Sequence, residues 1–230
     1  MSDFMKALDN NKIALVVSLA RNDVNLAQAA IEAGADALKV HLNVHHHASG
    51  NNFGSFDDES ENLKPIIALC KKQGIPIGVV PGTSDLDMHE LKKISNIGFN
   101  FISMYDKDMD PQIINFKSIN KLMAITYEYD IEWIKIMNEI EVDVLECSIM
   151  HPELYGTAFT MRDVLKLKSI RKYTDKPMLL PTQKAIKPEH IKILQEIGIN
   201  GLMIGAVVTG EEEKTLFEST KKFRDAIDKL

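Results

Sequence analysis

The sequence has few cysteines, no long apolar run and no cluster of basic residues. Each of these shortages argues against a class of protein. Only two cysteines, Cys70 and Cys147, occur among 230 residues, and both stand in apolar periodic segments. We interpret them as buried thiols of a protein in a reducing compartment, which predicts a cytoplasmic location. No window approaches the roughly 18 apolar residues that a membrane span needs. The charged N-terminal segment also lacks the features of a signal peptide.

Charge of one sign is not concentrated anywhere in the chain. It contains 27 basic and 33 acidic residues, with a formal net charge of −6 and a pI of about 5.7. Without a basic stripe, neither nucleic acid nor an anionic membrane surface is an expected partner. The hydrophobic content of 45% and the length of 230 residues are enough for one large core.

The sequence does contain a regular alternation of short apolar segments with longer amphipathic ones. Short β-branched runs indicate strands, and periodic apolar residues between capping residues and glycines indicate helices. The expected strands cover 12–20, 36–42, 75–82, 99–105, 121–127, 142–149, 176–182 and 201–210. The expected helices cover 23–35, 57–74, 84–98, 110–119, 130–141, 160–173, 187–198 and 211–230. Such alternation produces parallel strands joined by helical crossovers.

Eight β–α units in this length predict an α/β fold of the (β/α)8, or TIM, barrel type, formed by one domain over residues 1–230. A doubly wound open sheet is the alternative. It usually has fewer strands at this length and a glycine-rich turn after its first strand. Here the first strand runs into SLARND, which contains no glycine.

Two charged residues interrupt strands that are otherwise apolar. Lys39 shares one face of the second expected strand with His41, and Glu146 lies in the sixth. A charge inside a barrel is costly unless it is paired or used, so Lys39 and Glu146 are either a structural ion pair or a catalytic pair. As a catalytic pair, Glu146 would act as base, and Lys39 would stabilise an oxyanion or form an imine. His41 would then be a second acid or base.

The last two units predict a phosphate site. Gly205 and Ala206 end the eighth expected strand, and small residues at a helix start let the backbone approach an anion. Thr182 and Lys184 follow the seventh strand, close to where barrels commonly bind phosphate. The alternative is that these small residues only allow the strand and helix to pack closely.

The rim of the expected barrel carries two further candidate ligand contacts. Arg21 follows the first strand, and Asn43 extends the face that carries Lys39 and His41. Both are plausible contacts because active sites of such barrels are built at the C-terminal ends of the strands.

Three consecutive histidines, His45–His47, begin the loop after the second strand. Neighbours in sequence cannot all point at one ion, so a metal site would have to combine His41, Glu146 and His151 with His45 or His47. No HExxH or CxxC motif accompanies them. A divalent metal therefore stays an alternative, no other cofactor is expected, and we interpret residues 45–54 as a mobile lid.

Two segments resemble a known group of barrels. AAIEAGADALKV (29–40) and GINGLMIGAVVTG (198–210), with the order of the units, look like ribulose-phosphate-binding barrels, a group that includes phosphate-sugar epimerases and indole-glycerol-phosphate synthase. Residues 121–149 followed by HPELYGT (151–157) are similar in layout to N-acetylmannosamine-6-phosphate 2-epimerases. The resemblance implies a phosphorylated substrate.

The same epimerases differ from this chain at their catalytic positions. They carry a lysine at the end of the third strand and a glutamate after the seventh. This chain has Pro81 and Thr182–Gln183 there. The epimerase residues therefore do not carry over, which favours a related but different reaction.

Taken with the resemblance, the residues predict an enzyme that acts on a small phosphorylated metabolite, in the first place a sugar-phosphate isomerase or epimerase. An imine-forming or metal-assisted lyase or aldolase would use the same residues. A non-catalytic sensor of a phosphometabolite is the alternative from another class. A homodimer formed through helical faces is a possible assembly.

Overall fold

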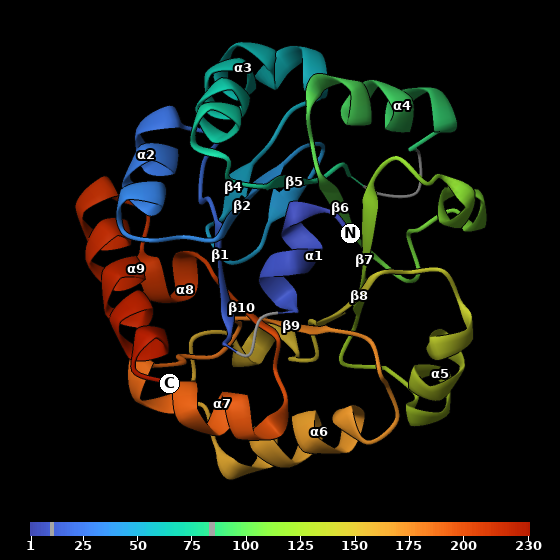
Figure 1. The fold of residues 1–230 in the computed structure, drawn as a ribbon, viewed down its shortest axis with the longest axis vertical. Helices are drawn as coiled ribbons and strands as arrows, with labels where there is room; N and C mark the ends of the chain where they lie inside the picture. Colours follow the sequence, from blue (N-terminus) through green and yellow to red (C-terminus); the bar gives the residue numbers. More distant parts are fainter. Residues whose placement is uncertain (10–11, 83–85) are drawn as a thin grey trace.

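Eight parallel strands close into a barrel in the computed structural model, which describes residues 1–9, 12–82 and 86–230 and is viewed along the barrel axis in Figure 1. This confirms the predicted (β/α)8 barrel. Around the barrel, the strands are β1 (Ala14–Ser18), β2 (Ala37–His41), β5 (Ile77–Val80), β6 (Phe101–Tyr105), β7 (Asn120–Ile125), β8 (Val144–Cys147), β9 (Met178–Pro181) and β10 (Gly201–Ile204). Strand β10 pairs with β1 and closes the ring.

Helices surround the strands, as Figure 1 shows. The longer ones are α2 (Val24–Glu32), α3 (Phe56–Gln73), α4 (Met88–Ile97), α6 (Met161–Arg171), α7 (Ile191–Ile197) and α9 (Glu213–Asp228). Helix α3 illustrates why they form where they do. Ser55 caps its first turn in a capping box, and Gly74 ends it in the left-handed conformation.

Several expected boundaries were wrong. The expected strand 201–210 ends at Ile204, and Ala206–Thr209 form the short helix α8 despite their β-branched residues, because tertiary context overrides local propensity. The expected helix 110–119 is a 3₁₀ turn, η1 (Pro111–Asn115). The expected helix 130–141 is only α5 (Ile131–Ile136) followed by a 3₁₀ turn, η2 (Met137–Glu139). Two more 3₁₀ turns are η3 (Pro152–Leu154) and η4 (Pro188–His190). The first residues of the expected helix 84–98 lie outside the described residues.

The N-terminal segment forms a helix that the sequence pattern did not predict. Helix α1 (Asp3–Leu8) lies inside the ring of strands in Figure 1. Its Phe4 and Leu8 are buried, and the Phe4 ring stacks on Phe101 at 4.0 Å between centroids. The helix closes the N-terminal end of the barrel with an apolar layer that consists of Phe4, Leu8, Ala14, Val16, Ala37, Phe101, Leu122, Val144, Leu179 and Met203.

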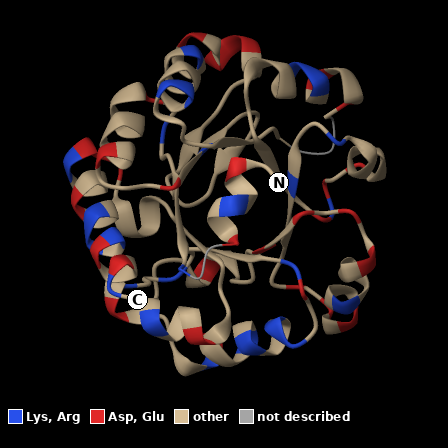
Figure 2. Ribbon diagram, in the orientation of Figure 1, with Lys and Arg blue, Asp and Glu red and all other residues tan. Residues whose placement is uncertain are grey.

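Polar side chains fill the other half of the barrel interior. The buried polar or charged residues that line this half, near the C-terminal strand ends, are Ser18, Lys39, His41, Ser103, Glu146, Ser148, Thr182 and Gln183. Most other Lys, Arg, Asp and Glu residues lie on the outer helices and connections in Figure 2. The fold therefore directs any ligand to the C-terminal mouth. In the described part of the chain, no helix has both the length and the hydropathy needed to cross a membrane.

Gly78 of β5 packs directly against Phe101 of the apolar layer, and this contact leads to a testable prediction. A Cβ added there would lie 2.0 Å from Phe101 Cε2. We expect Gly78→Ala to lower the free energy of unfolding by about 1–3 kcal/mol through overpacking, measured by urea denaturation.

Gly205→Ala is the matched control for this substitution. Its Cβ would meet Ser18 Cβ at 3.5 Å, an ordinary contact, and its φ of −148° suits any residue. Equal stability of the two variants would contradict the argument from Phe101.

Candidate active site

A cavity of about 320 Å³ opens at the C-terminal ends of the strands, and each of the eight barrel strands contributes to its wall. The residues that line it from the strands and the positions just after them are Ser18, Lys39, His41, Val80, Ser103, Met104, Tyr105, Ala124, Glu146, Ser148, Pro181, Thr182, Gln183, Met203 and Gly205. Its remaining wall comes from residues 44–48 and from Gly82, Lys107, Asp108, Tyr155 and Val207. This is the position where barrels of this fold bind their ligands.

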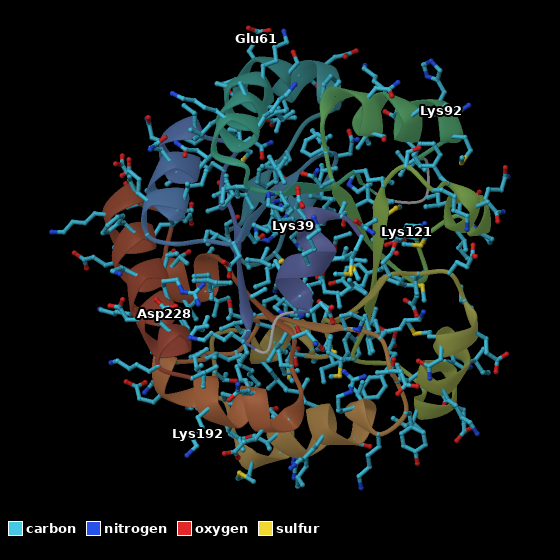
Figure 3. The ribbon with its side chains drawn as sticks, viewed as in Figure 1. Lys39, Glu61, Lys92, Lys121, Lys192 and Asp228 are labelled. Atoms are coloured by element: carbon cyan, nitrogen blue, oxygen red, sulfur yellow. The ribbon has the colours of Figure 1, made fainter. Side chains whose placement is uncertain are left out.

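The structure brings Lys39 and Glu146 together across the barrel interior. Lys39 Nζ lies 3.7 Å from Glu146 Oε1, and the two side chains are only 7% and 6% exposed. Ser103 Oγ donates a hydrogen bond of 2.7 Å to the other carboxylate oxygen, Oε2. Figure 3 shows Lys39 inside the ring of strands, whereas Lys92 and Lys192 lie on outer helices. The pair is thus nearly sealed from bulk solvent but forms part of the cavity wall.

His41 lies near this pair and is 2% exposed. Its Nε2 is 3.5 Å from Ser18 Oγ, at the limit of a hydrogen bond. Asn22 holds the backbone of His41 by donating to its carbonyl at 2.9 Å and accepting from its N–H at 3.3 Å. Burial, with His46 and Lys39 nearby, lowers the pKa of His41 well below 6.5. We therefore expect His41 to act as a neutral imidazole at pH 7 and not as a cation.

Gln183 organises a set of hydroxyl groups on one wall of the cavity. Its Nε2 donates to Ser148 Oγ at 2.9 Å and to Tyr155 Oη at 2.5 Å, and its Oε1 accepts from Met150 N–H at 3.1 Å. The Ser148 hydroxyl in turn lies 3.2 Å from Tyr105 Oη. Because the Met150 N–H fixes which end of the amide accepts, Ser148 and Tyr155 each receive a bond and keep their own protons for donation.

Both tyrosines of this wall stay protonated. Burial raises the pKa of Tyr105 to about 12, and burial also raises the pKa of Tyr155. The wall is therefore a source of neutral hydrogen-bond donors. The sequence offered a signal for Tyr105, since alternation in FISMY places it on the face of Ser103. It offered none for Tyr155, and Gln183 stood out only as a departure from the epimerase pattern.

The candidate phosphate site lies at the start of α8. Gly205 and Val207 line the cavity, and the Gly205 N–H donates to Thr182 Oγ1 at 3.1 Å. The first bonds of the turn are made by Val208 and Thr209 to the Gly205 carbonyl. The N–H groups of Ala206 and Val207 precede those bonds. Of these two residues only Val207 lines the cavity, so the predicted contact of Ala206 with a phosphate stays a prediction.

Three other residues that were expected to contact a ligand do not line the cavity formed by the described residues. Their side chains interact with other residues of the protein. Arg21 lies 3.6 Å from Glu211 in an ion pair. Asn43 is exposed, and its Nδ2 donates to the Pro81 carbonyl at 3.0 Å. Lys184 Nζ donates to Thr157 Oγ1 at 2.6 Å. Their proposed ligand contacts receive no support from this geometry and stay predictions.

The histidine loop forms a short antiparallel hairpin of β3 (His45–His46) and β4 (Asn51–Asn52). Residues 44–48 of this segment form part of the cavity wall. The His46 ring lies 4.3 Å from the His41 ring, and the His47 ring lies 5.1 Å from Tyr155. Asn51 Nδ2 ties the hairpin to the barrel by donating to the Ala20 carbonyl at 3.0 Å and to Glu211 at 3.1 Å. The segment expected to be a lid is therefore a short hairpin that lines the cavity, and its mobility stays a prediction.

The alternative metal site receives no support from these positions. In the described residues, no three His, Cys, Asp or Glu side chains gather closely enough to hold a metal ion. His45 Nδ1 pairs with Asn52 Oδ1 and His46 Nδ1 with Ser49 Oγ, both at 2.8 Å. His151 Nδ1 accepts the Glu153 N–H at 3.3 Å.

The partly buried His46 makes stability depend on pH. Burial and the charge of Lys39 lower its pKa from 6.5 to about 4. Between these values the unfolded chain binds more protons than the folded one, so stability falls as pH falls from 6.5 to 4. We expect His46 to account for a loss of about 3 kcal/mol over this window, measured by urea denaturation at several pH values.

The exposed His89 on the outer helix α4 provides the control for this prediction. His46→Gln should reduce the slope of stability against pH, whereas His89→Gln lies far from the cavity and should leave the slope unchanged. The same slope in both variants would show that His46 does not determine the pH dependence.

Comparisons with known proteins support the barrel fold but do not identify a function. No protein-family model matches the chain, and no curated protein matches it significantly. Among solved structures, tryptophan synthase from Mycobacterium tuberculosis is 12% identical, with a TM-score of 0.74 and 99% of each chain covered. Thiamine phosphate pyrophosphorylase from Pyrococcus furiosus is 15% identical, with a TM-score of 0.68, covering 96% of this chain and 98% of its own. At these identities the chain shares their (β/α)8 barrel fold, and the resemblance to N-acetylmannosamine-6-phosphate 2-epimerases stays a prediction.

Proposed function

We propose that the protein is an enzyme that isomerises or epimerises a small phosphorylated metabolite, in the first place a sugar phosphate. The observation that carries the proposal is the pair of Lys39 and Glu146, 3.7 Å apart, buried and facing the cavity. A buried ion pair is a weak source of stability, because removing two charges from water offsets most of their attraction. A pair placed in the wall of a ligand-sized cavity is therefore better explained by chemistry than by folding.

The reaction assigns a role to each group at the mouth. Glu146 removes a proton from a carbon next to a carbonyl, and the electron pair of that bond passes to the carbonyl oxygen. The ammonium of Lys39 and the hydroxyl of Tyr105 stabilise this oxyanion. An epimer forms when a second acid, the role proposed for His41, donates a proton to the opposite face of the same carbon while Glu146 keeps the first proton. An isomer forms when Glu146 returns its proton to the neighbouring carbon while the hydroxyl proton of the first carbon moves to the oxyanion. Ser103 holds the carboxylate in place throughout.

The substrate class rests on the start of α8 and on the size of the cavity. The backbone N–H group of Val207, which lines the cavity at the start of α8, suits a phosphate oxygen. A volume of about 320 Å³ suits a small metabolite. One similar barrel, from Pyrococcus furiosus, is named for a phosphate compound, which agrees with this assignment.

Solvent exchange across a panel of phosphorylated aldoses and ketoses tests the proposal. We expect the protein to exchange a carbon-bound proton of at least one of these sugars for deuterium in D2O, followed by proton NMR. The same sugars without phosphate are the matched control and should not exchange. Absence of exchange and of turnover with every phosphorylated sugar would contradict an isomerase or epimerase. A shift in melting temperature with phosphorylated sugars, but no exchange, would indicate a sensor.

An imine-forming lyase is the second candidate, because the Lys39 amine lines the cavity beside a carboxylate that can act as its base. Borohydride reduction in the presence of a carbonyl substrate distinguishes the two reactions. Covalent attachment of substrate to Lys39, detected by peptide mass spectrometry, would replace the proton-transfer reaction by imine chemistry. Loss of activity after exhaustive chelation would instead favour the metal-assisted alternative.

A further inference from the structure

Gln183 lies in the wall of the cavity and is 5% exposed. Its Oε1 accepts the Met150 N–H at 3.1 Å, which fixes the orientation of the amide. Nε2 then lies 2.9 Å from Ser148 Oγ and 2.5 Å from Tyr155 Oη. An amide nitrogen donates but does not accept, so both hydroxyl oxygens must accept these bonds.

The two hydroxyl groups that accept from Gln183 meet again at Tyr105. Ser148 Oγ lies 3.2 Å from Tyr105 Oη, and either oxygen can be the donor. Burial raises the pKa of both tyrosines, and a hydrogen bond between their side chains adds to this rise for Tyr105 and opposes it for Tyr155. Gln183, Ser148, Tyr105 and Tyr155 therefore form a ring of hydrogen-bonding groups.

This ring contains one more proton than it uses. The two bonds from Gln183 use no hydroxyl proton, and the two bonds made by Tyr105 use one each, whichever side donates. Three hydroxyl groups supply three protons, so one is left for a group outside the ring. Ser148, Tyr105 and Tyr155 all line the cavity, and a ligand oxygen there can accept it.

We propose that Gln183 is a positioning residue, whose two N–H groups make this wall donate one hydrogen bond to the carbonyl oxygen of the substrate. The inference rests on the proposed function and adds the reason why Tyr105 can act as a donor in it. An oxyanion beside Tyr105 attracts the Tyr105 proton, and the Tyr155 hydroxyl then turns to donate to Tyr105. Bonds in such a chain polarise one another, so the donor at its end is strengthened. No proton leaves the ring in this step.

A second role for Gln183 would be purely structural. Its backbone carbonyl accepts the Gly156 N–H at 2.9 Å, so the residue also holds the segment that follows β8. A substitution that tests the inference must therefore reverse the direction of the side-chain bonds and preserve the shape of the side chain.

Gln183→Glu makes this reversal. The carboxylate can still accept the Met150 N–H, but it needs protons from Ser148 and Tyr155. The four contacts of the ring then all require hydroxyl protons, and only three exist, so none is left for the substrate. We expect kcat to fall by about 10²–10³-fold, the usual effect of a lost oxyanion donor, with a much smaller change in KM.

Gln183→Met separates the direction of the bonds from the shape of the side chain. Methionine neither donates nor accepts, so the hydroxyl protons stay free but are no longer directed. We expect a smaller loss of kcat than for Gln183→Glu. A purely structural role predicts the opposite order, because glutamate preserves more of the shape and the bond to Met150. Gln112→Glu on the exposed turn η1 is the control and should leave kcat unchanged.

Tyrosine labelled with ¹³C at Cζ provides a readout that needs no substrate. The chain contains five tyrosines, and the Tyr155→Phe protein identifies the Tyr155 signal. In the Gln183→Glu protein the Tyr155 hydroxyl should donate to the carboxylate, which should move its Cζ signal toward the position of a phenolate. Gln112→Glu should leave the signal in place.

Two outcomes would overturn the inference. One is a folded Gln183→Glu protein whose kcat equals or exceeds that of Gln183→Met, and the other is a Tyr155 signal that does not move. If circular dichroism shows that Gln183→Glu does not fold, an unchanged kcat of Gln183→Met overturns it. The proposed function fails separately, through absence of turnover by the unmodified protein, and the Tyr155 signal then still decides the direction of the bonds.

Discussion

Glu146→Gln is expected to reduce turnover by about 10²–10⁴-fold, the usual contribution of a positioned general base. Glutamine has the shape of glutamate, and its carbonyl oxygen can still accept the hydrogen bond from Ser103. It cannot accept a proton from carbon, so the substitution removes the chemical step and preserves the cavity. The measurement is kcat, together with the rate of deuterium exchange into the phosphorylated sugar that the wild-type protein accepts.

Two matched variants make this result specific. Glu141→Gln changes a carboxylate on the outside of the barrel, where Glu141 pairs with Lys117, and should leave kcat unchanged. Ser103→Ala keeps the carboxylate but removes its hydrogen bond, so its effect should be smaller than that of Glu146→Gln. Nearly normal exchange by the Glu146→Gln protein would remove Glu146 from the mechanism.

The second large effect is expected on stability. Lys39→Met should lower the free energy of unfolding by about 3–5 kcal/mol. The substitution leaves the Glu146 carboxylate buried at 6% exposure, with Ser103 as its remaining hydrogen-bond partner among the described residues. An uncompensated buried charge is far more costly than a missing attraction. The double variant Lys39→Met with Glu146→Gln should therefore regain most of the lost stability, because it contains neither charge.

A double-mutant cycle by urea denaturation measures this coupling. Lys64→Met is the control. Lys64 pairs with Glu61 on the surface of α3, with side chains 66% and 84% exposed, so the change should be small. Additive effects of the Lys39 and Glu146 substitutions would show that the two charges do not depend on each other. The cycle reports stability alone, so it tests the ion pair even if the substrate is not a sugar phosphate.

The pairing of Lys39 with Glu146 could be predicted from the sequence because charged residues are rare in buried strands. Alternation of side chains places Lys39 and His41 on one face, and the barrel directs that face inward. The cost of an isolated buried charge then makes Glu146 the natural partner of Lys39. The expected contacts of Arg21 and Lys184 rested only on their positions after strands, and that of Asn43 extended the strand alternation beyond the end of the strand. Position in a loop does not determine where a flexible side chain points.

The sequence by itself determined the (β/α)8 barrel, because hydrophobic periodicity and capping residues act locally and repeat eight times. It also determined that two charges enter the interior. Only the tertiary structure decided that α1 closes the base, that residues 45–52 form a hairpin over the cavity, and that Gln183 joins Ser148 and Tyr155. The physical reason is that these features depend on contacts between segments far apart in the chain, which no local pattern encodes. The hairpin pairing itself is local, but its position over the cavity depends on the bonds of Asn51 to Ala20 and Glu211.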